Sequence, residues 1–164
     1  MNEHLHNFIE SLREELKQYG ELLALLDLQQ DQVLRRAADD ILATTQTLNT
    51  QGEAIRVARE ERIQRLRDLT GSLGLSDEVR IKAVLPSLAP AHRPLITALV
   101  EENNQLLVRV RQRARQNHIL LHRSVELMEK LINSLCALSA PTYNETGGRA
   151  VSMASRHGLY EGIG

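Results

Sequence analysis

Apolar residues recur at steps of three and four along most of the chain, which is the spacing of one face of an α-helix. The first stripe begins at Leu5 and ends at Val33, and no proline interrupts it. Its members are Leu5, Phe8, Leu12, Leu16, Tyr19, Leu23, Leu26, Gln30 and Val33. The stripe predicts a long helix whose apolar side packs lengthwise against another helix.

A second, weaker stripe predicts another long helix. It consists of Ala38, Ile41, Thr45, Leu48, Gly52, Ile55, Arg59, Ile63, Leu66 and Leu69. The junction between the two stripes falls near Arg36–Asp40, where Asp39 and Asp40 suit the first turn of a new helix. Because neither glycine nor proline marks this junction, two separate helices and one continuous helix both fit the pattern.

Turn-forming residues follow the second stripe. Gly71 and Gly74 predict a glycine C-cap, and Ser76 suits the N-cap of a short helix at Val79–Leu85, which Pro86 would end. The stretch Pro86–Pro94 then predicts a stiff connector, or in part the first turn of the next helix.

The third stripe is the longest and spans residues 95–138. Its members are Leu95, Leu99, Asn103, Leu106, Val110, Ala114, Asn117, Leu121, Ser124, Met128, Leu131, Leu135 and Leu138. At 1.5 Å per residue this predicts a helix of about 65 Å, which needs other long helices to pack against. We therefore predict an all-α fold, an elongated antiparallel helical bundle or coiled-coil hairpin of three long helices and one short helix. Its main seam would be formed by Leu99, Asn103, Leu106, Val110, Asn117, Leu121, Met128 and Leu135.

The periodic pattern stops after Leu138, and residues 139–164 are rich in glycine, serine and alanine. This predicts a helical bundle over residues 1–138 and a flexible, partner-binding tail over residues 139–164. The apolar residues of the tail that could anchor a partner are Tyr143, Val151, Met153, Leu159, Tyr160 and Ile163. Tyr143 is the strongest recognition candidate, because the chain has few aromatic residues and this one follows the last helix directly.

Composition excludes several classes of protein. Aromatic residues make up 2% of the chain, too few for a β-rich core or a base-stacking surface. The net charge of −1 disfavours nucleic acid or an anionic membrane as the main partner. The N-terminal residues lack the pattern of a secretory signal, and no apolar run is long enough for membrane insertion. The single cysteine, Cys136, cannot form an internal disulfide, which favours a reducing compartment.

Candidate chemistry is sparse. His118 and His122 lie four residues apart, but no second cluster completes a metal site, so we expect neither metal nor cofactor. Cys136 has no histidine and aspartate in a recognisable arrangement, and no glycine-rich phosphate loop follows a strand, so the pattern does not indicate an enzyme. The arginines at 109, 111, 113 and 115 fall on two opposing faces of a helix, which argues against a nucleic-acid surface.

Two asparagines interrupt the apolar seam of the last long helix. Asn103 and Asn117 either contact a partner or form buried polar layers that fix the register of neighbouring helices, and we favour the second interpretation.

The region from Asn104 to Arg149 resembles the C-terminal helix and tail of the FlgN family of flagellar export chaperones. The matching positions are Asn104, Gln116-Asn117, Leu120-Leu121, Arg123-Ser124-Val125-Glu126, Leu131-Ile132-Asn133, and Thr142-Tyr143 leading to Gly147. The resemblance implies a non-enzymatic, cytoplasmic chaperone that binds the hook–filament junction proteins FlgK and FlgL and delivers them to the type III export gate. It further implies client binding by the tail and docking of Tyr143 on the export-gate protein FlhA.

Two other classes of function remain open from the sequence. One is a structural coiled-coil adaptor that dimerises through the long seam and has no secreted client. The other is a helical nucleic-acid-binding module that uses the arginines. The sequence leaves the oligomeric state undetermined.

Overall fold

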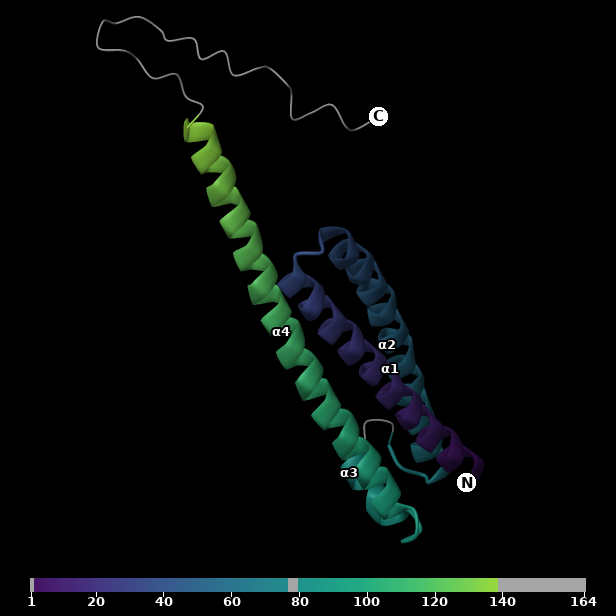
Figure 1. The fold of residues 1–164 in the computed structure, drawn as a ribbon. Coiled ribbons are helices and arrows are strands. Elements are labelled where there is room, and N and C mark those ends of the chain that lie inside the picture. Colours follow the sequence, from purple (N-terminus) through teal and green to yellow (C-terminus); the bar gives the residue numbers. More distant parts are fainter. Residues whose placement is uncertain (1, 77–79, 139–164) are drawn as a thin grey trace, which may run out of the picture. The chain divides into compact units, whose positions relative to one another are not determined.

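A computed structural model describes residues 2–76 and 80–138, and within these ranges the chain is helical (Figure 1). The elements are α1 (Asn2–Arg35), α2 (Ala38–Ser72), α3 (Ile81–Val84), the 3-10 helix η1 (Leu85–Ser87) and α4 (Arg93–Leu138). The predicted fold class, three long helices and one short helix, is confirmed. The chain divides into two compact units, Met1–His122 and Arg123–Gly164, and the boundary lies within α4. The predicted boundary at residue 138 stays a prediction, since residues 139–164 lie outside the described part.

In the first unit, α2 runs antiparallel to α1 and α4 runs parallel to it. Gln51 on α2 donates a hydrogen bond from Nε2 to the carbonyl of Gln18 on α1, and Gln29 on α1 donates to Oγ1 of Thr45 on α2. Later residues of α1 therefore pair with earlier residues of α2. Contacts between α1 and α4 instead ascend along both helices, as the asparagine bonds described below show. Along the axis of the bundle, α1 and α4 therefore run in one direction and α2 runs in the opposite direction.

Two apolar clusters form the core of this unit. The first joins the N-terminal half of α1 to α2 and α4, and Phe8, Leu12, Leu69 and Ile96 are at most 1% exposed there. The short elements contribute to it, because Val84 of α3 is also buried against this cluster. The second cluster comprises Tyr19, Leu23, Leu26, Ile55 and Val110.

The structure confirms the first predicted stripe and corrects part of the second. Every member of the first stripe is buried or half-buried. On α2, however, Arg59 and Ile63 are exposed, and Ala58 is buried. The cause is Arg62, whose Nε lies 2.6 Å from a carboxylate oxygen of the buried Glu15 on α1. This ion pair turns Arg62 inward and rotates the exposed side of α2 accordingly.

The junction between α1 and α2 is a tight turn centred on Arg36, so the first two stripes form separate helices. Arg36 has a φ of 59°, the left-handed region that a glycine usually occupies at this place. Its N–H donates to the carbonyl of Val33 at 3.1 Å, and the N–H of Ala37 donates to that of Gln32 at 3.1 Å. These two bonds form a Schellman motif, which ends the helix without help from glycine.

The end of α2 uses the same motif with the predicted glycine. Gly74 has a φ of 67°, and the N–H of Leu75 donates to the carbonyl of Thr70 at 2.9 Å. The short helix begins at Ile81, later than predicted, and Pro86 lies within η1. Arg93, the first residue of α4, binds the connector that precedes this helix, because its guanidinium donates hydrogen bonds to the carbonyls of Leu88 and Pro86.

We expect Arg36→Gly to stabilise the chain by about 1 kcal/mol, because glycine adopts a positive φ without the steric cost that a side chain carries. Gly74→Ala is the matched opposite change and should destabilise the chain by a similar amount. Chemical denaturation monitored by circular dichroism measures both. An unchanged or lower free energy of unfolding for Arg36→Gly would show that the turn is not strained.

Candidate functional site

The seam predicted along α4 is buried over only part of its length. Leu99, Asn103, Val110 and Asn117 are buried, and Leu106 and Leu121 are half-buried. Met128 and Leu135, in contrast, are 58% and 66% exposed. Exposure therefore divides the predicted seam between Leu121 and Met128, and the packing of its residues after His122 against other helices stays a prediction. The apolar pattern of the sequence continues after His122, but the large apolar side chains in that part of α4 are exposed.

Six large apolar side chains of α4 lie uncovered in the second unit. They are Val125, Leu127, Met128, Leu131, Ile132 and Leu135, and each is more than half exposed. At 100° per residue they occupy an arc of about 160° around the helix. Glu126, Glu129 and Lys130 lie on the opposite side, where Nζ of Lys130 is 3.2 Å from Oε1 of Glu126. We call the six residues the apolar face.

The width of the apolar face indicates how it can be covered. Folded monomers rarely leave a contiguous group of large apolar side chains in water, so such a group marks an interaction surface. A simple two-stranded coiled coil uses two positions in seven, whereas here the flanking positions Val125, Leu127 and Ile132 are apolar as well. The face therefore fits a groove or a pair of helices better than one narrow helix seam.

The two seam asparagines bind α1 inside the first unit. Asn103 donates from Nδ2 to the carbonyl of Leu12 at 3.0 Å, and Asn117 donates to that of Leu26 at 2.7 Å. The asparagines are 14 residues apart, and so are the carbonyls. Since a slip along the helix would break both bonds at once, the pair holds α4 in one register on α1. Their burial agrees with the interpretation of buried polar layers.

Asn117 also belongs to a chain of hydrogen bonds that crosses all three long helices. It donates to Oε1 of Gln29 on α1 at 3.0 Å, and Gln29 donates to Oγ1 of Thr45 on α2 at 3.1 Å. Thr45 in turn donates to the carbonyl of Ile41 at 2.7 Å. The polar layer therefore orders α1, α2 and α4 relative to one another.

A second polar cluster surrounds Glu15, whose side chain is 6% exposed. Arg62 forms the close ion pair with it, Arg59 approaches to 4.0 Å, and Tyr19 donates its hydroxyl hydrogen to Oε1 at 3.1 Å. Burial and the nearby carboxylate raise the pKa of the Tyr19 phenol. These groups line a cleft of about 220 Å³, but they bind one another, so we assign the cluster to the contact between α1 and α2.

The other predicted site residues are placed as follows. Tyr143, Val151, Met153, Leu159, Tyr160 and Ile163 lie outside the described residues. His118 and His122 are exposed on α4, and the ranges 2–76 and 80–138 contain no cluster of three or more residues suited to bind a metal ion. Within these same ranges no helix is long and apolar enough to span a membrane.

Sequence reasoning missed two features. It did not assign Val125, Leu127 and Ile132 to the apolar surface, although the residues that flank the seam on both sides could have been checked for apolar side chains. It also missed the pairing of Glu15 with Arg62, because 47 residues separate them and no local pattern links them.

We expect substitution of the apolar face to leave folding intact. Met128→Ala combined with Leu135→Ala should change the free energy of unfolding by less than about 1 kcal/mol, because both side chains are already in water. Phe8→Ala, in the core, should cost about 3–5 kcal/mol. Denaturant unfolding compares them. A large loss of stability from the double substitution would mean that the face is covered within the free chain.

Comparison with known proteins identifies one family. The family model for the FlgN protein matches residues 1–150 of the chain. Neither a curated protein nor a solved structure matches it. The matched region includes all described helices, the buried asparagine layers and the apolar face. The chain therefore belongs to the FlgN family of flagellar export chaperones.

Proposed function

We propose that this protein is a cytoplasmic export chaperone that binds the junction proteins FlgK and FlgL, keeps them unassembled and delivers them to the export gate through FlhA. Membership of the FlgN family supports the general role. The observation that carries the proposal is the apolar face on α4, a group of six large apolar side chains that are each more than half exposed.

The chemistry of the face suits clients that assemble through amphipathic helices. A client helix that buries its apolar side against Leu131 and its neighbours can no longer use that side for assembly. Each large side chain that becomes covered contributes about 1.5–3 kcal/mol. The cost of association offsets much of this sum, so the complex can be both specific and reversible, as delivery requires.

The proposed site combines the apolar face with the tail. Tyr143, Val151, Met153, Leu159, Tyr160 and Ile163 are the tail residues that we propose as additional client anchors. Ordering such a segment on the client costs free energy, which keeps affinity moderate for the buried area. Tyr143 is the residue that we propose for docking on FlhA.

We expect the full chain to form a discrete complex with FlgK and with FlgL in copurification. Met128→Asp combined with Leu131→Asp should abolish the complex, since charges on the apolar face cannot be buried against a client. The matched control is Leu34→Asp with Leu42→Asp, because these leucines are 70% and 64% exposed but lie on α1 and α2. A chain that ends at Leu138 measures the contribution of the tail.

The outcomes separate the alternatives. Loss of binding in the face variant but not in the control supports the apolar face as the client site. Binding by the face variant together with loss in the truncated chain would assign the client site to the tail alone. Self-association without binding to either client would overturn the proposal and favour a structural coiled-coil adaptor.

We expect Tyr143→Ala to weaken binding of the chaperone–client complex to the cytosolic domain of FlhA at least tenfold, as the loss of a central aromatic anchor does. Asn144→Ala is the matched control, since it changes the neighbouring residue, which the proposal assigns to neither partner. Biolayer interferometry with immobilised FlhA domain measures both. Equal affinity of Tyr143→Ala and the unsubstituted chain would remove Tyr143 from the gate contact.

A further inference from the structure

The middle of α4 carries positive charge, and its own sequence contains no acidic residue. Residues 103–125 contain five arginines and two histidines, and no aspartate or glutamate. The arginines of α2 are arranged differently. There Arg56 lies 2.6 Å from Glu53 and Arg65 lies 3.1 Å from Glu61, both on the same helix. The charge on α4 is therefore a local exception in a chain whose net charge is −1.

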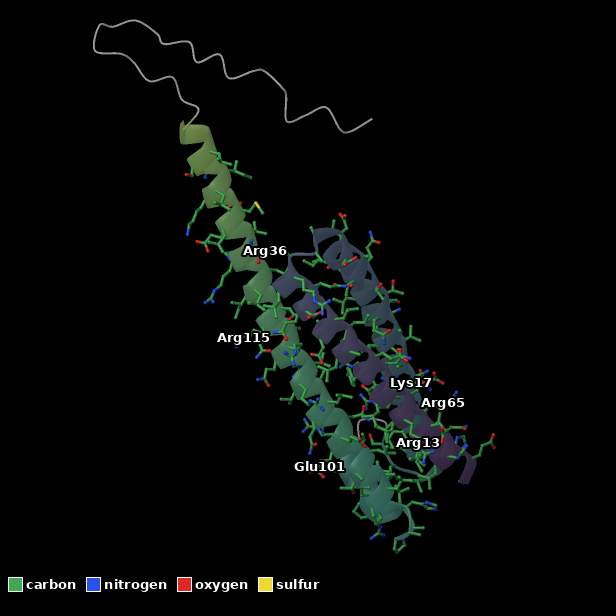
Figure 2. The ribbon with its side chains drawn as sticks, in the orientation of Figure 1. Arg13, Lys17, Arg36, Arg65, Glu101 and Arg115 are labelled. Carbon is green, nitrogen blue, oxygen red and sulfur yellow. The ribbon has the colours of Figure 1, made fainter. Side chains whose placement is uncertain are left out.

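Four of these residues line up on one strip of the helix. Arg111, Arg115, His118 and His122 follow steps of four, three and four, and all are exposed. Figure 2 shows Arg115 on the side of α4 that faces away from α1. The strip is about 16 Å long at 1.5 Å per residue. We call these four residues the basic strip, and they all lie in the first unit, before the apolar face begins.

Arg113 of α4 has an acidic partner within the bundle, but the arginines of the basic strip do not. Arg113, on the opposite side, lies 2.6 Å from Asp27 of α1 and also bonds Gln30. Among the described residues, neither Arg111 nor Arg115 has an acidic group within ion-pair distance. Two like charges at this spacing destabilise a helix slightly. The arrangement therefore carries a small cost in the free chain that an acidic partner would remove.

Apolar side chains accompany the strip. Val108 and Ile119 are 61% and 42% exposed, and the steps from Val108 to Arg111, Arg115 and Ile119 are three, four and four. Cations beside exposed aliphatic side chains suit a protein helix, which offers carboxylates and apolar groups with the same spacing. Nucleic acid would instead favour a longer basic surface with stacking side chains, which the strip lacks.

We infer that the basic strip, with Val108 and Ile119, is a second protein-docking surface that binds an acidic amphipathic helix of a partner. Arg111 and Arg115 would bind carboxylates spaced by one helical turn, and arginine suits this contact because its planar guanidinium can bind a carboxylate with two hydrogen bonds. The inference does not depend on the client-binding role, because it uses different residues.

A designed helical peptide tests this inference with the full chain. The probe carries glutamates at positions 1, 5, 8 and 12 and leucines beside them, and the control peptide has glutamine in place of glutamate. Fluorescence anisotropy at low and high salt measures binding. We expect the acidic peptide to bind, and Arg111→Gln with Arg115→Gln to weaken it about tenfold. Arg13→Gln with Arg65→Gln removes the same net charge elsewhere and is the matched control (Figure 2).

Each outcome decides the inference. The inference is supported if the chain binds the acidic peptide more tightly than the control peptide and this preference weakens as the salt concentration rises. The strip variant should lose the preference, and the matched control variant should keep it. Equal binding of both peptides, equal loss in both variants, or no binding would overturn it. Tighter binding of a duplex oligonucleotide or of phosphatidylserine vesicles than of the peptide would also overturn it. Thermal unfolding of the strip variant should be unchanged or slightly higher, which excludes loss of fold as the cause.

Discussion

The register between α1 and α4 depends on two buried asparagine side chains. A purely apolar seam permits sliding by one heptad with little loss, since one leucine can replace another. Asn103 and Asn117 remove this freedom, because each donates from Nδ2 to a particular backbone carbonyl of α1, and a shift of α4 would bury that N–H group without this acceptor. Through Gln29 the second asparagine also fixes α2, so the relative position of all three long helices follows from one polar layer.

The apolar face and the basic strip both depend on this fixed register. With α4 held on α1, its buried side ends near Leu121 and its outer side carries Arg111 and Arg115. A bundle free to slide would bury different residues of α4 in different molecules. A binding surface made from one helix is specific only when the rest of the fold determines which part of that helix is left uncovered.

The sequence predicted each long helix, but it predicted burial unevenly. The prediction for α1 was correct because nearly all members of its stripe are large and apolar, so only one side of the helix can face the core. On α2 the apolar residues were too few to indicate which side of the helix faces the core. The ion pair between Glu15 and Arg62, which are distant in sequence, determined that side instead. On α4 the pattern was continuous, yet Met128 and Leu135 are exposed. Periodicity shows that a side avoids water, but it cannot show whether the same chain or another protein covers it.

The parallel pairing of α1 and α4 has a consequence for how the chain acquires its structure. Each asparagine bond closes a loop of 91 residues, whereas Gln29 and Thr45 are only 16 residues apart. Because closing a short loop costs less entropy, we expect the α1–α2 hairpin to form before α4 docks. During synthesis on the ribosome, α1 therefore has one side paired and the other still in water until residue 117 has emerged. The core of the first unit is therefore completed by the long helix that is made last.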